Sequence, residues 1–156
     1  MSILVAADFS PTEWQAWWPV LAEALPGETL VREPADLSDV EMALVANPPP
    51  GLLVTLPRLR FIQSLWAGVD RLLADASVPR HIPLARMVDP VMSQAIAETA
   101  LWATLSLHRD FFDYAEQQNR REWWQRPQRR ADEVTVAVLG LGEMGRAAAL
   151  RLAGNG

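Results

Sequence analysis

The chain has 156 residues, of which 50% are hydrophobic and 21% charged, so it is long enough for one ordinary domain or two partial ones. Its net charge of −5 argues against a broad nucleic-acid or anionic-membrane surface and leaves small molecules or proteins as partners. All 14 basic residues are arginine, which excludes a Schiff-base or phosphate-binding lysine, and no cysteine is present. These features favour a reducing, cytoplasmic setting.

Neither a membrane segment nor a metal site is expected. The start of the chain, MSILVAADFS, lacks a basic region, and Gln94 and Glu98 interrupt the most apolar later stretch. His81 and His108 lie far apart and match no metal-binding spacing.

The first part of the chain alternates strands with helices. Apolar patterning predicts a helix that starts at Pro11 and carries Trp14, Trp17 and Trp18, and a short helix over residues 69–76. Strands are predicted over residues 2–7, 29–32, 42–46 and 61–66, with the third stopped by Pro48, Pro49, Pro50 and Gly51. This order is typical of an α/β domain with a parallel sheet covered on both faces.

The second part predicts a long helix followed by the start of another α/β unit. Apolar residues recur at helical spacing over residues 91–122, and no Pro or Gly interrupts them. The run VTVAVL over residues 134–139 is typical of a strand buried in a parallel sheet, and a helix ending at Gly154 follows it.

The segment GLGEMG, residues 140–145, carries the GxGxxG pattern between that strand and that helix. Gly140 allows the tight turn, Gly142 lets a diphosphate approach the main chain, and Gly145 lets helix and strand pack closely. The context favours a dinucleotide site over a merely tight turn. The residue that selects NAD or NADP is expected about 20 positions further on, past Gly156. We therefore expect the chain to be part of a longer protein.

Two other segments leave alternatives open. Ala67, Gly68 and Val69 in SLWAGVD follow a strand and offer NH groups that suit a small carboxylate, although an ordinary turn relieved by Gly68 explains them as well. The arginine-rich stretch of residues 120–130 is interpreted as a solvated turn, with an anion site as the minor alternative.

The order of three segments carries a family resemblance: LWAGVD, then SQAIAETALWATLSLHRDF with QNRREWW, then VTVAVLGLGEMGRAAALRLAG. This order resembles the N-terminal half of the D-isomer-specific 2-hydroxyacid dehydrogenases, and within them the glyoxylate/hydroxypyruvate reductase A type. The resemblance implies a flavodoxin-like substrate domain over residues 1–90, a hinge and dimerisation segment over 91–130, and the beginning of a Rossmann cofactor domain over 131–156.

The resemblance also implies roles for particular residues. Ala67, Gly68 and Val69 would hold the carboxylate of a 2-oxo acid through their NH groups, and Met92 and Ile96 would line the nicotinamide. Leu141, Glu143 and Met144, together with the three motif glycines, would bind the diphosphate of NADP or NAD. The family's catalytic Arg, Glu and His would lie beyond Gly156, so no catalytic residue is expected in this chain.

The expected activity is reduction of small 2-oxo acids such as glyoxylate or hydroxypyruvate by a homodimer. A non-catalytic dinucleotide-binding module that regulates or dimerises remains the alternative.

Overall fold

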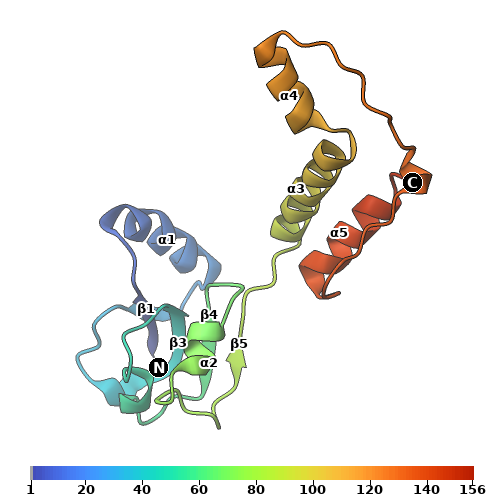
Figure 1. Cartoon of the computed structure of the whole chain (residues 1–156). Coiled ribbons are helices and arrows are strands. Elements are labelled where there is room, and N and C mark those ends of the chain that lie inside the picture. Colours follow the sequence, from blue (N-terminus) through green and yellow to red (C-terminus); the bar gives the residue numbers. More distant parts are fainter. Residues whose placement is uncertain (1) are drawn as a thin grey trace. The chain divides into compact units, whose positions relative to one another are not determined.

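The structure is a computed structural model that describes residues 2–156. It divides into two compact units, Met1–Met87 and Val88–Gly156. Figure 1 labels the helices and strands of both units.

The first unit is built on a five-stranded, wholly parallel sheet with the strand order β2-β1-β3-β4-β5. Its strands are β1 (Ser2–Ala7), β2 (Thr29–Val31), β3 (Val40–Ala46), β4 (Phe61–Ser64) and β5 (Leu84–Ala85). This is the flavodoxin-like order, which confirms the fold class expected from the sequence. Strand β5 was not predicted from the sequence, because two residues are too few to show an alternating pattern.

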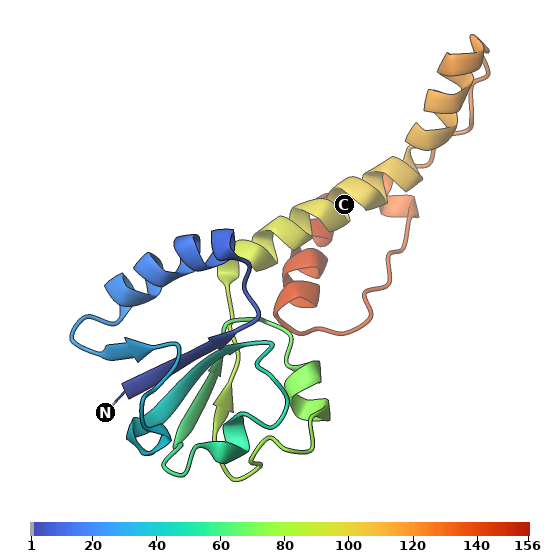
Figure 2. The ribbon, with the colours of Figure 1, turned by 90° about the vertical axis from the view of Figure 1, so that its left-hand side faces the viewer.

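One face of the sheet is covered by α1 (Pro11–Ala24), which begins where the sequence predicts (Figure 2). Ser10 caps the helix through a reciprocal pair of hydrogen bonds with Glu13. These bonds, from the hydroxyl and the NH of Ser10, lower the pKa of the Glu13 carboxyl. Leu21 on this helix packs over Ile3 and Val5 of β1.

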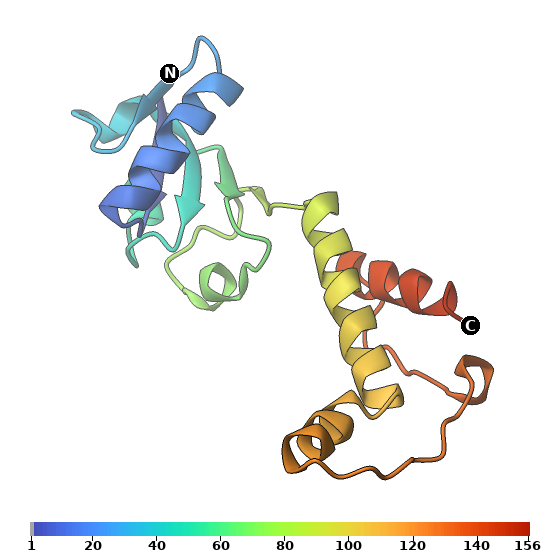
Figure 3. The same ribbon diagram turned by 90° about the horizontal axis from the view of Figure 1, so that it is seen from above.

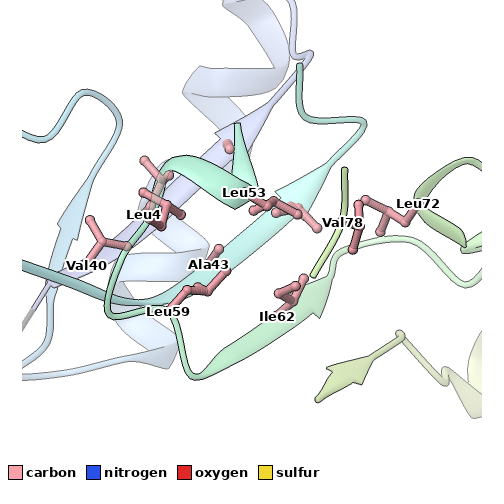
Figure 4. Close-up of a cluster of buried hydrophobic side chains, with 11 residues drawn as sticks. Leu4, Val40, Ala43, Leu53, Leu59, Ile62, Leu72 and Val78 are labelled. Atoms are coloured by element: carbon pink, nitrogen blue, oxygen red, sulfur yellow. The ribbon is translucent and has the colours of Figure 1, made fainter. Parts of the chain in front are cut away.

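The opposite face is covered by α2 (Asp70–Ala74) and by a short 3-10 helix, Leu53–Thr55. Figure 4 shows Leu53 and Leu59 lying over Ala43, with Val78 and Leu72 at the side of the same cluster. Alternate residues of each strand supply the two faces, so the sheet is buried on both sides.

The second unit contains α3 (Pro90–His108), α4 (Phe111–Arg120) and α5 (Glu143–Ala153). Figures 1 and 2 show α3 and α5 lying side by side and running in the same direction. Ala97 and Ala148 are the buried alanines of these helices, and their small side chains allow close packing. No helix among residues 2–156 combines the length and the apolar character needed to cross a bilayer.

The prediction of one uninterrupted helix over residues 91–122 is wrong. The helix ends at His108, because Asp110 adopts the left-handed backbone conformation with φ of 55°, and α4 then starts at Phe111 (Figure 3). Asp tolerates that conformation better than most residues. Arg126 makes an ion pair with Asp110 at 3.5 Å and another with Asp113, which ties the returning chain to this break.

Residues 134–139 do not form the expected strand. Val134 is extended, with φ of −117° and ψ of 131°, but no strand among residues 2–156 pairs with this segment. An apolar hollow of about 230 Å³ lies between the segment, α3 and α5, and it is lined by Leu101, Leu105, Val134, Val138 and Leu152 among others. A parallel ladder requires a neighbouring strand, which explains the difference.

We predict that Ile62→Ala destabilises the first unit by about 2 to 5 kcal/mol, because Ile62 is fully buried in the sheet core and its loss leaves a cavity. Urea unfolding followed by circular dichroism measures this effect. The exposed Val54→Ala is the control and should change stability by less than about 0.5 kcal/mol. Equal effects of the two substitutions would contradict the assignment of this core.

Candidate functional site

The first candidate site is the turn that links β4 to α2. Within residues 2–156, no acceptor is found for the NH groups of Ala67, Gly68 or Val69. Three consecutive main-chain donors without partners suit a small anion, because backbone NH groups carry partial positive charge and need an acceptor. Gly68 is exposed, and Ala67 and Val69 are half-buried.

Hydrogen bonds hold the main chain of Trp66, the residue directly before this turn. The Ser64 side chain is buried, and its Oγ donates to the Trp66 carbonyl at 3.1 Å and accepts from the Trp66 NH at 3.1 Å. The Met87 NH also donates to the Trp66 carbonyl, at 3.2 Å. Ser64 was missed at the sequence level; the available signal was a small polar residue, next to Gln63, inside a predicted strand.

At Gly68 the structure leaves room for a methyl group. A Cβ atom built there meets only the Asp70 carboxylate, at 3.7 Å, which is an ordinary contact. Gly68 also has no positive φ. Neither packing nor backbone conformation of the unit therefore requires glycine at this position.

The second candidate site is the glycine loop at the start of α5, in the other unit. Gly140 has φ of 86°, a left-handed conformation that favours glycine. At Gly145 an added Cβ would lie 2.0 Å from the Gly140 carbonyl oxygen, so only glycine fits against this backbone. These two glycines therefore shape the turn, as the sequence predicts.

Gly142 has neither constraint: it caps α5 in an extended conformation with negative φ, and an added Cβ would meet nothing within 4 Å. No acceptor among residues 2–156 is found for the NH groups of residues 141–145, the donors that the first turn of a helix leaves free. A diphosphate fits such a cradle, since it needs several main-chain donors and an approach clear of side chains. The binding roles of Leu141, Glu143 and Met144 remain predictions.

Met92 and Ile96 lie four residues apart in the first two turns of α3 and so share one face of that helix. Met92 is half-buried and Ile96 is 43% exposed. Because α3 and α5 run in the same direction, these residues belong to the same end of the unit as the glycine loop (Figures 1 and 2). Their contact with a nicotinamide remains a prediction.

Three of the five arginines in the stretch of residues 120–130 make ion pairs. Arg120 pairs with Glu116, Arg126 with Asp113, and Arg130 with Asp132 at 2.6 Å. These pairs favour the solvated-turn interpretation over an anion site, because their charges are already balanced by neighbouring carboxylates.

Comparison with known proteins places this arrangement in one class. No family model matches the chain. A probable 2-hydroxyacid dehydrogenase from Rhizobium etli CFN 42, solved with NADP, HEPES and L(+)-tartaric acid, matches with a TM-score of 0.87 and 32% identity. That match covers 99% of this chain and 50% of the other. The resemblance seen in the sequence is confirmed: the chain is similar, over about half of their length, to D-isomer-specific 2-hydroxyacid dehydrogenases.

Within that class, the named relatives are reductases. The chain is 32% identical over 154 residues to glyoxylate/hydroxypyruvate reductase A of Serratia proteamaculans, covering 95% of this chain and 48% of the relative. The NADPH-dependent glyoxylate/hydroxypyruvate reductase of Sinorhizobium meliloti, solved with NADP and sulfate, matches with a TM-score of 0.84 and 31% identity over all of this chain and 50% of that one. The chain thus spans about half the length of the curated relatives that it matches.

The local geometries of Gly145 and Gly142 predict different losses of stability when each glycine is replaced by alanine. Gly145→Ala should destabilise the turn by about 1 to 3 kcal/mol, because the new methyl group overlaps the Gly140 carbonyl. Gly142→Ala, the matched control, should cost less than about 1 kcal/mol, because its methyl group enters open space and only the preference for glycine at the N-cap is lost. Amide hydrogen exchange of α5 reports the difference as loss of protection in the first variant only. Similar exchange in both variants would argue against this close approach.

Proposed function

We propose that this chain forms the substrate-binding part and the diphosphate-binding part of an NADP- or NAD-dependent reductase of small 2-oxo acids. Residues 1–90 act as the substrate domain, 91–130 as hinge and dimerisation segment, and 131–156 as the start of the cofactor domain. The observation that carries the proposal is the glycine loop, where a tight turn, a close packing contact and a clear approach to free NH groups coincide.

The chemistry assigned to this chain is binding and orientation. The NH groups of Ala67, Gly68 and Val69 hold the substrate carboxylate, and those of residues 141–145 hold the cofactor diphosphate, with Met92 and Ile96 beside the nicotinamide. The cofactor supplies the hydride that reduces the carbonyl carbon. The Arg, Glu and His implied by the family resemblance belong outside these 156 residues.

NADP is favoured as the cofactor. The Rhizobium etli and Sinorhizobium meliloti proteins were both solved with NADP. A D-lactate dehydrogenase from Aquifex aeolicus solved with NAD matches at only 18% identity and supports the fold alone. Glyoxylate and hydroxypyruvate are proposed as substrates because the named relatives are reductases of these two acids.

The whole protein that carries this chain should oxidise NADPH when glyoxylate or hydroxypyruvate is added, as followed by the absorbance of the reduced cofactor.

Gly68→Ala should raise the KM for glyoxylate roughly tenfold or more without unfolding the protein, because its methyl group stands where the carboxylate approaches. NADPH binding without turnover on any 2-oxo acid would instead favour the non-catalytic module. Absence of both binding and turnover would contradict both proposals.

Homodimerisation is proposed from the segment that follows α4. Trp123 is 97% exposed and Trp124 is 62% exposed, and they border a hollow with Tyr114 and Gln118. Exposed aromatic side chains that lie together are typical of protein interfaces.

Sedimentation should therefore show a dimer that the double variant Trp123→Ala, Trp124→Ala shifts toward monomer. Val20→Ala, an exposed apolar change on α1, is the control and should leave the mass unchanged. A wild-type monomer, or a double variant that stays dimeric, would contradict this interface.

A further inference from the structure

Three aromatic rings from separate segments meet at the carboxyl edge of the sheet in the first unit. Phe9 follows β1, Trp17 lies on α1 and Trp66 follows β4. The Phe9 ring stacks on Trp17 with centroids 5.6 Å apart, and Trp66 lies edge-on to Phe9 at 6.0 Å and to Trp17 at 6.1 Å. Ligands of parallel α/β sheets bind outside the carboxyl ends of the strands.

The main chain of Trp66 is held by hydrogen bonds, in addition to the contacts of its ring. Its NH and carbonyl both bond to the buried Ser64 hydroxyl, and its carbonyl also accepts from Met87. The next three residues are Ala67, Gly68 and Val69, whose NH groups have no acceptor among residues 2–156. The direction of these donors therefore depends on how Trp66 is held.

We propose that Trp17 is a positioning residue for the carboxylate turn: it does not touch the substrate, but it fixes Trp66 and thereby aims the NH groups of Ala67–Val69. This inference rests on the proposed role of that turn. A site held in its binding geometry before the ligand arrives does not spend binding free energy on ordering itself, so loss of Trp17 weakens carboxylate binding.

The neighbouring Trp18 provides a matched control. It is half-buried like Trp17 and packs on the same face of the sheet, but its ring contacts Trp14, at 6.1 Å, and makes no aromatic pair with Trp66. Both substitutions to alanine remove the same side chain from adjacent positions of α1. A general loss of packing affects the two variants alike, whereas positioning affects Trp17→Ala alone.

The test is an NMR titration of the whole protein that carries this chain with sodium glyoxylate, against sodium chloride at equal ionic strength, following the amides of Ala67, Gly68 and Val69. These amides should shift saturably with glyoxylate in the wild type. Trp17→Ala should weaken the apparent affinity at least fivefold. Trp18→Ala and the conservative Trp17→Phe should stay within twofold of the wild type.

A second readout requires no variant and covers the case in which Trp17→Ala fails to fold. Saturating glyoxylate should shift the indole NH signals of Trp66 and Trp17 in the wild type and leave that of Trp18 in place. Turn amides that respond while both of these indoles stay unchanged, or a folded Trp17→Ala that binds normally, would overturn the positioning role. Turn amides that do not respond even in the wild type would contradict the proposed carboxylate site itself.

Discussion

The close approach of Gly145 to the carbonyl of Gly140 is the constraint on which the second unit depends. A methyl group at Gly145 would lie 2.0 Å from that oxygen, so the loop can pass this near to the helix only because the side chain is absent. In this loop, which also contains the left-handed turn at Gly140, the NH groups of residues 141–145 have no acceptor among residues 2–156. Main-chain donors that are held in place and lack acceptors form an anion site without any positively charged side chain.

The first unit also contains main-chain NH groups without acceptors, in the turn between β4 and α2. Its turn after β4 also presents main-chain donors, and again no cationic side chain is needed. There the donors are held by Ser64 through hydrogen bonds and, as we propose, by the aromatic rings around Trp66. The two sites that we propose, for a diphosphate and a carboxylate, are therefore compatible with a net charge of −5, because the field at each site is local.

The features predicted correctly from the sequence are mostly those in which the backbone or its packing requires one particular residue type. The left-handed turn at Gly140, the close contact at Gly145, the Pro48–Pro50 block that ends β3 and the start of α1 at Pro11 all follow from the special sterics of glycine or proline. The parallel sheet was predicted because strands alternate with helices, whereas its flavodoxin-like strand order was implied only by the family resemblance. The placement of the turn at residues 67–69 followed from the end of a strand and a glycine.

The failures share a cause, which is dependence on contacts made at a distance. The break at Asp110 involves Arg126, sixteen residues away, and the periodicity of α3 and α4 gives no sign of it. Residues 134–139 have the composition of a buried strand, but a strand exists only when a neighbour pairs with it. Ser64 is an exception, because its partner Trp66 is only two residues away and the signal was a polar residue within a predicted strand.

The most direct test of the account is a crystal structure of the whole protein that carries this chain, grown with NADPH. The account predicts the diphosphate within hydrogen-bond distance of the NH groups of residues 141–145, with the closest approach over Gly142. A cofactor bound elsewhere, or a side chain filling the space above Gly142, would contradict it.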